Sequence, residues 1–165
     1  LARADAGGGE LNRERFDAGE AAEHVFRTMQ PLAEARGVIL ELSGERNLFI
    51  QADKDRIVQL LMILADNGIK FTPPGGRVTI RVDQERPNSI LLEVADTGMG
   101  LSPEDRQRVF ERFYRVDKAR SREEGGAGLG LSIAVWIVDA HGGTIEVQAA
   151  GGGGSLFRVV LPTNS

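Results

Sequence analysis

Two glycine clusters constrain this chain more than any other feature of its sequence. The run Asp96-Thr97-Gly98-Met99-Gly100 directly follows an apolar segment, and Gly125-Gly126-Ala127-Gly128-Leu129-Gly130 precedes another. Glycines let the backbone adopt φ > 0 and approach a charged group closely, and free N–H groups at a helix start favour an anion. Two such loops in one short chain predict a pocket for a phosphorylated ligand, with the Asp96 carboxylate as a fixed acceptor.

The bulk composition limits the classes to which the chain can belong. Its 165 residues are enough for one domain with a buried core. The net charge of −4 disfavours nucleic-acid binding, and the absence of cysteine excludes a disulfide framework and a thiolate metal site. No segment approaches the about 18 apolar residues that a membrane-spanning helix requires. Because the chain starts with Leu1 rather than methionine, we expect it to be a C-terminal piece of a larger protein.

Helix signals divide the first half of the chain. Residues 1–15 are polar and glycine-rich, and we interpret them as a linker. Asp17 starts a helix with a capping pattern, which Pro31 is expected to kink or shorten. A second helix starts at Asp53 and is ended by residues 73–76, a Pro-Pro-Gly-Gly run.

Runs of apolar residues predict six strands, at 38–42, 48–52, 77–82, 90–95, 144–148 and 156–161. Ser43-Gly44 is expected to turn the chain between the first two, while residues 87–89 and 151–154 each close a hairpin. Further helices are expected at 103–113 and 129–140. The pattern predicts an α+β fold in which one mixed, mostly antiparallel sheet carries helices on one face.

One face of the second helix carries polar groups suited to phosphate chemistry. Ile63, Asn67 and Lys70 follow one another at helical spacing. The Asn67 amide oxygen suits Mg²⁺, and Lys70 supplies a point charge for phosphate. By itself this pattern fits an ordinary helix end better, with Asn67 as a C-cap and Lys70 answering the helix dipole.

Each glycine cluster also has an ordinary explanation. Asp96 would select adenine by accepting from its amino group, or it forms a simple Asx turn at a strand end. The second cluster is neither a Walker A loop nor a dinucleotide fingerprint, because no Gly-Lys-Ser/Thr follows and Leu131 stands in the last glycine's place. It can serve as a hinge, and residues 151–154 show glycine in what we interpret as a plain turn.

The segment between the clusters is rich in charge, with Arg112, Arg115, Lys118, Arg120 and Arg122. A solvated loop is the default interpretation, and a lid over a polyphosphate is the functional one. Neither histidine is a good catalytic candidate. We expect His24 at a helix surface and His141 at a helix C-terminus, where a partial positive charge is favourable.

Taken together and in this order, these segments resemble the catalytic ATP-binding domain of bacterial sensor histidine kinases, in the superfamily shared with gyrase, Hsp90 and MutL. The resemblance covers residues 16–162. Its motifs are an N box at 66–73, a first glycine box at 96–101, an F box at 109–115, a second glycine box at 126–133 and a strand motif at 141–147. The F box separates histidine kinases from the gyrase and Hsp90 branches.

The resemblance implies a Bergerat-type fold, a two-layer α/β sandwich. It implies a linker from a dimerisation helix at 1–15, the catalytic domain at 16–162 and a tail at 163–165. The catalytic residues it implies are Asn67, Lys70 and Arg115, with Asn67 as the Mg²⁺ ligand. The nucleotide-binding residues it implies are Asn67, Lys70, Phe71, Asp96, Gly98, Gly100, Leu101, Lys118, Gly126, Gly128, Leu129, Gly130 and Leu131.

The resemblance also implies partners. ATP and ADP bind together with Mg²⁺, and the γ-phosphoryl group passes to a histidine on a dimerisation domain that this chain lacks. From there it passes to an aspartate of a response regulator. We expect a monomeric fragment of a homodimeric parent, a cytoplasmic domain whose parent can be anchored in the bacterial inner membrane, and no nucleic-acid partner.

Two positions depart from the family pattern. Ile63 stands where the family usually has asparagine, and Gly68 where it usually has alanine. A helical glycine costs about 1 kcal/mol relative to alanine. A non-catalytic ATP- or ADP-binding regulatory module therefore stays open as an alternative. A gyrase-type ATPase ranks last, because Ile63 cannot activate a water.

Overall fold

The computed structural model describes residues 11–98, 100–110, 130–151 and 153–163. In chain order its elements are β1 (Arg13–Asp17), α1 (Ala18–Ala35), β2 (Ile39–Gly44), β3 (Phe49–Asp53), α2 (Lys54–Lys70), β4 (Arg77–Arg86), β5 (Ser89–Asp96), α3 (Pro103–Arg108), α5 (Gly130–Ala140), β6 (Thr144–Ala149) and β7 (Ser155–Pro162). Within the described residues, no helix is both long enough and apolar enough to cross a membrane.

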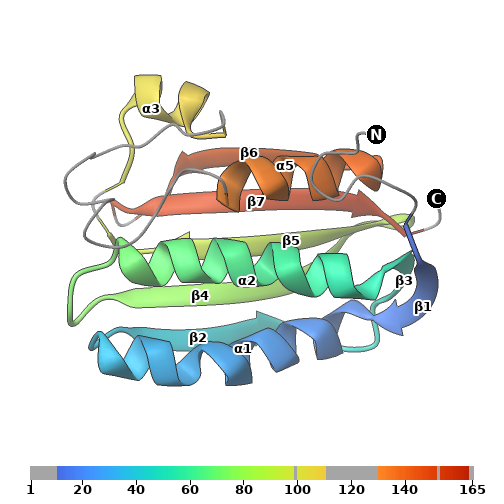
Figure 1. Cartoon of the computed structure of the whole chain (residues 1–165), viewed down its shortest axis with the longest axis horizontal. Coiled ribbons are helices and arrows are strands. Elements are labelled where there is room, and N and C mark those ends of the chain that lie inside the picture. Colours follow the sequence, from blue (N-terminus) through green and yellow to red (C-terminus); the bar gives the residue numbers. More distant parts are fainter. Residues whose placement is uncertain (1–10, 99, 111–129, 152, 164–165) are drawn as a thin grey trace.

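Five strands form one sheet in the order β2-β4-β5-β7-β6. The pair β2–β4 is parallel and the other pairs are antiparallel. Helices α1, α2 and α5 lie side by side over one face of this sheet (Figure 1). The α+β prediction of a mixed, mostly antiparallel sheet with helices on one face is therefore confirmed.

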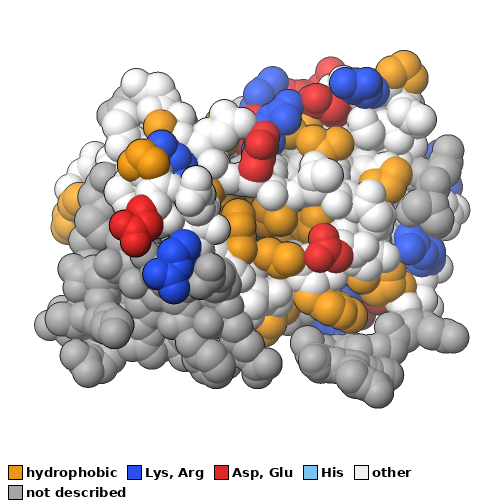
Figure 2. Space-filling view, turned by 90° about the horizontal axis from the view of Figure 1, so that it is seen from above, with side chains coloured by type: hydrophobic (Ala, Val, Ile, Leu, Met, Phe, Trp, Pro, Cys, Tyr) orange, Lys and Arg blue, Asp and Glu red, His pale blue; other side chains and the backbone are white. Residues whose placement is uncertain are grey.

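The two faces of the sheet differ in polarity because strand side chains alternate. On β4, Val78 and Ile80 are fully buried towards the helices. On the other face Arg81 pairs with Glu93 at 3.1 Å, and Arg158 pairs with Glu85 at 3.0 Å. Figure 2 looks onto the edge of the molecule where β6 and α5 lie, and hydrophobic side chains gather on this surface.

The predicted turn at Ser43-Gly44 is wrong. Both residues belong to β2, whose parallel partner is β4, whereas β3 pairs with β1 in a separate two-stranded sheet. Gly44 has φ +109°, and a Cβ there would overlap the carbonyl oxygen of Val82 on the neighbouring strand. The glycine therefore permits close strand pairing rather than a turn.

Pro31 does not shorten the first helix, which continues to Ala35. Helix α1 packs on α2 and β2, and Met29 and Ala33 on either side of this residue are buried, so tertiary contacts maintain the helix despite the missing N–H group. The predicted helix at 103–113 is described as α3 up to Arg108, and residues 111–113 lie outside the described part.

Both ends of the described chain are tied to the fold. Strand β1 starts at Arg13, inside the segment interpreted as a linker, and pairs with β3. In the segment interpreted as a tail, the Thr163 carbonyl accepts from Gln51 N–H at 2.9 Å, and Thr163 N–H donates to Asn88 at 2.9 Å. Backbone pairing with distant residues is what holds these segments in place.

Candidate functional site

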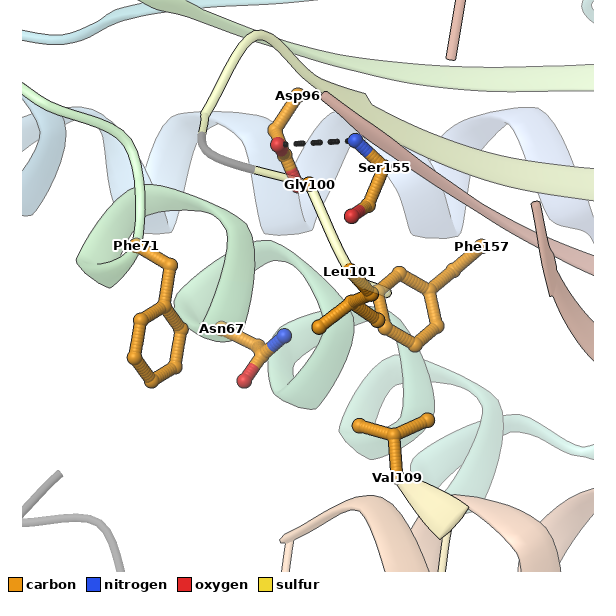
Figure 3. A pocket seen from close by; sticks show the side chains of 8 residues that line it. All are labelled: Asn67, Phe71, Asp96, Gly100, Leu101, Val109, Ser155 and Phe157. Carbon is orange, nitrogen blue, oxygen red and sulfur yellow. Dashed lines mark hydrogen bonds between the residues drawn. The ribbon is translucent and has the colours of Figure 1, made fainter. Parts of the chain in front are cut away.

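One pocket opens between the C-terminal half of α2, the end of β5 and the start of β7. The empty space inside it, counted together with the open solvent at its mouth, is about 410 Å³. Its lining residues are Asn67, Phe71, Asp96, Gly100, Leu101, Val109, Ser155 and Phe157 (Figure 3). The first five are candidates from the sequence, which the fold brings together from separate segments.

Asp96 lies at the floor of this pocket, at the end of β5, and is only 7% exposed. Its Oδ1 atom accepts hydrogen bonds from Gly98 N–H at 2.9 Å and from Ser155 N–H at 3.2 Å. Burial raises the pKa of Asp96 above its ordinary value, and these two donors limit the rise. Both bonds use Oδ1, so Oδ2 keeps its lone pairs for a ligand. The Asx turn proposed as the ordinary explanation is present, and it orients the carboxylate.

Glycines allow three segments to meet around this carboxylate. A Cβ on Gly98 would lie 2.5 Å from the Phe71 carbonyl oxygen, and a Cβ on Gly154 would overlap the backbone oxygen of Asp96. Interpreting residues 151–154 as a plain turn is therefore wrong for Gly154, where the chain passes directly against Asp96. The close approach puts Ser155 beside the carboxylate.

Helix α2 presents Asn67 to the pocket (Figure 3). The helix continues to Lys70 and its C-cap is Phe71, so the interpretation of Asn67 as a C-cap is wrong. Lys70 Nζ is 3.2 Å from Asp66 Oδ2 in an ion pair one turn apart, and Lys70 does not line the pocket.

The remaining candidates divide into two groups. Gly130 and Leu131 start α5, outside the pocket lining, and a Cβ on Gly130 would lie 3.4 Å from Ile63 Cγ2. The others lie outside the described residues, and they are Arg115, Lys118, Gly126, Gly128 and Leu129. The roles predicted for both groups stay predictions.

Sequence reasoning missed three lining residues, Val109, Ser155 and Phe157. Val109 opens the F box, and its motif was therefore a usable signal. Ser155 and Phe157 reach the pocket because β7 pairs with β5 in a register that sets Leu156 opposite Ala95. The Phe157 ring also meets Phe110 edge-on, with centroids 6.0 Å apart. No local feature of the sequence predicts the register in which β5 and β7 pair.

The side chains that could act as metal ligands limit the kind of metal site that the pocket can form. Among the described residues, no three His, Asp or Glu side chains are grouped to hold one. Mg²⁺ is often held by one or two protein oxygens, with phosphate oxygens and waters completing its shell. A single amide such as Asn67 at the pocket wall fits a metal of this kind only together with a phosphorylated ligand.

Comparison with known proteins agrees with this geometry. The family described as histidine kinase-, DNA gyrase B-, and HSP90-like ATPase matches residues 52–165. Sensor histidine kinase WalK of Bacillus subtilis is 43% identical over 72% of this chain and 20% of its own length. Sensor protein SrrB of Staphylococcus aureus is 36% identical over 98% of this chain and 28% of its own length. The chain thus spans less than a third of these relatives.

Among solved structures, full-length ShkA in complex with AMPPNP superposes with a TM-score of 0.82 and 31% identity. The match covers 96% of this chain and 33% of that one. Family, relatives and structure agree, and the chain therefore belongs to the histidine kinase-, DNA gyrase B- and HSP90-like ATPase family, as a catalytic domain of the sensor histidine kinase type.

Proposed function

We propose that this domain binds Mg-ATP and donates its γ-phosphoryl group to a histidine on a dimerisation domain outside this chain. The observation that carries the proposal is the Asp96 carboxylate, which two backbone N–H groups hold at the floor of an apolar pocket. Its second oxygen is suited to accept from the adenine amino group. The ATP analogue in the ShkA complex and the names of the relatives support this proposal and favour it over a purely regulatory module.

Different lining residues would contact the faces and the polar edge of the base. Phe71, Leu101, Val109 and Phe157 give apolar walls against which a planar base packs. Ser155 has its backbone N–H engaged with Asp96, and its hydroxyl can make one further polar contact to the base edge. A guanine would meet Asp96 with a carbonyl oxygen, so two acceptors would face each other.

The phosphates would extend from the base towards Asn67 and the start of α5. Asn67 would hold Mg²⁺ through its amide oxygen, and the metal would neutralise charge on the phosphates. Lys70 would contact phosphate after leaving its ion pair with Asp66. Arg115 and Lys118 would approach the γ-phosphate, while Gly126, Gly128, Leu129, Gly130 and Leu131 would surround the phosphate chain.

Transfer then requires positioning and charge neutralisation more than covalent help from this domain. The bond between the γ-phosphorus and the bridging oxygen breaks, a phosphorus–nitrogen bond forms on the acceptor imidazole, and ADP leaves. Partners of the parent protein would be the histidine-bearing dimerisation domain and then a response regulator.

Two measurements test this proposal. Calorimetric titration with ATP, in Mg²⁺ and then in EDTA, should show saturable binding that the metal alters. Incubation with γ-labelled ATP and the dimerisation domain of the parent should then label that domain. Absence of ATP binding in both solutions would refute the assignment of this pocket as the nucleotide site. Binding without phosphoryl transfer would favour the alternative of a regulatory module.

A further inference from the structure

His141 follows α5 and is almost fully buried, at 2% exposure. Its Nδ1 atom is 2.8 Å from the Ile137 carbonyl oxygen, and its Nε2 atom accepts from Asp53 N–H at 3.1 Å. Burial lowers the pKa of His141 below its ordinary value of 6.5, and Arg13 lowers it too, whereas the bond to Ile137 and the Asp53 carboxylate oppose this. His141 follows the C-terminus of α5 as expected, but its buried imidazole is neutral near pH 7 and adds no positive charge there.

The two hydrogen bonds define the tautomer. Since Asp53 N–H donates to Nε2, this atom carries no proton, and the proton on Nδ1 donates to Ile137. Asp53 is the N-cap of α2, and Ile137 lies in the last turn of α5. The imidazole therefore joins the first turn of one helix to the last turn of the other.

The same two helices meet again where α5 starts. Ile63 lies just past the middle of α2, and its Cγ2 atom is 3.4 Å from the Cβ position at Gly130, where α5 starts. The helices are thus antiparallel, as Figure 1 shows. The imidazole bridge lies at the end of α5, whereas the start of α5 lies beside Ile63, one turn of α2 before the pocket residue Asn67. A slide of α5 along α2 would break the bridge and displace Gly130.

The chain entering the domain joins this bridge. Asn12 N–H donates to Asp53 Oδ2 at 3.0 Å, and the Arg13 guanidinium approaches the Ala140 carbonyl oxygen at 3.5 Å. Asn12 directly precedes β1, and Arg13 is the first residue of that strand. The entry strand, the start of α2 and the end of α5 are therefore held by one set of hydrogen bonds.

We propose that His141 is a positioning residue of the nucleotide site, which locks α5 against α2 and so sets where the start of α5 lies relative to Asn67. This inference rests on the proposed function. The hydrogen bonds of His141 reach Asp53 and Ile137, which do not line the pocket. His141 acts through the register of the two helices, since the start of α5 and Asn67 of α2 would flank the phosphates.

A matched pair of variants separates this role from simple core packing. The amide of asparagine reaches the place of Nδ1, and that of glutamine reaches the place of Nε2. In His141→Asn the bond to Ile137 can survive and the bond to Asp53 is lost. In His141→Gln the bond to Asp53 can survive. Both variants lose a buried ring, so a purely structural role affects them alike.

We expect His141→Asn to weaken Mg-ATP binding about three- to tenfold, in the range of mutations that act through a packed network. His141→Gln should rescue most of this loss, and His24→Asn, at an exposed histidine of α1, should have no effect. In NMR spectra without nucleotide, the δ1-methyl resonance of Ile63 should shift in His141→Asn and stay near its wild-type position in His141→Gln.

Equal affinities in wild type and both histidine variants would overturn the inference, as would equal losses in both or an unmoved Ile63 methyl resonance. The methyl measurement needs no nucleotide. If wild type binds no ATP, the proposed function fails, and the Ile63 resonance still decides whether His141 sets the register of the helices.

Discussion

Replacing Asp96 by asparagine tests the base-binding assignment most directly. In the wild type, Oδ1 accepts from Gly98 N–H at 2.9 Å and from Ser155 N–H at 3.2 Å. In Asp96→Asn the amide oxygen has to take this inner position, because an NH₂ group cannot accept these bonds. The amide nitrogen then replaces Oδ2, so the pocket presents a donor where it presented an acceptor.

This exchange sets the size and direction of the effect. The amino group of adenine is a donor, so the variant loses a hydrogen bond to a charged acceptor, a bond that contributes about 1.5–3 kcal/mol. ATP affinity should fall roughly 10- to 150-fold, and the unfavourable pairing of two donors can abolish binding. Inosine triphosphate carries an acceptor oxygen at the same position of the ring. We therefore expect Asp96→Asn to bind inosine triphosphate more tightly than ATP.

Stability should respond differently from binding. The folded-state pKa of Asp96 is raised, so its contribution to stability is full below the unfolded-state pKa and is lost as pH rises through the folded-state pKa. At pH 7 the buried charge therefore opposes folding. Asp96→Asn removes this charge and can keep both backbone hydrogen bonds, so the free energy of unfolding should stay equal or rise.

The assay is calorimetric titration of wild type, Asp96→Asn and the control Asp139→Asn with ATP and with inosine triphosphate. Asp139 is an exposed residue of α5, so its variant makes the same charge change away from the pocket. Urea unfolding of the three proteins gives their stabilities. Near-native ATP affinity in Asp96→Asn would refute the assigned pocket, and loss of binding together with unfolding would refute the argument about orientation.

Three further predictions concern other parts of the structure. Gly154→Ala should lower the free energy of unfolding by about 1–3 kcal/mol, because its Cβ would overlap Asp96. Gly151→Ala has open space around its Cβ, so its free energy of unfolding should stay within about 0.5 kcal/mol of wild type. Equal midpoints of urea unfolding for the two variants would contradict this. Ile63→Asn should raise the rate of phosphotransfer to a supplied dimerisation domain with little change in ATP affinity, and an unchanged rate would show that the apolar side chain is harmless. Pro31→Ala should raise the free energy of unfolding by about 1–3 kcal/mol, since the proline is exposed inside α1; a lower thermal midpoint would show that the proline fits its site.

Helix starts and the hairpin of β4 and β5 could be read from local residues. Asp17 and Asp53 cap α1 and α2 with their own side chains, and the hairpin of β4 and β5 forms around its predicted turn. Such signals act over a few residues, so the sequence contains them in full. Pro31 shows their limit, because helix packing overrides a local preference.

Strand partners could not be read in this way. The alternation of apolar residues in β2 and β3 is the same whichever strand lies beside them. The sequence therefore suggested a turn between them, although β2 pairs with β4 and β3 with β1. For the same reason Ser155 and Gly154 were not recognised as neighbours of Asp96, about 60 residues earlier in the chain.

By itself, the sequence determined the α+β class, the helix starts and the motifs that supply Asn67, Phe71 and Asp96, because capping, periodicity and glycine placement are local properties. Only the tertiary structure decided that β7 completes the floor of the pocket. It alone decided that His141 joins α2 to α5. These features depend on which distant segments pair and in which register. The free energy that favours one pairing over another comes from packing the whole core, which no short segment of the sequence contains.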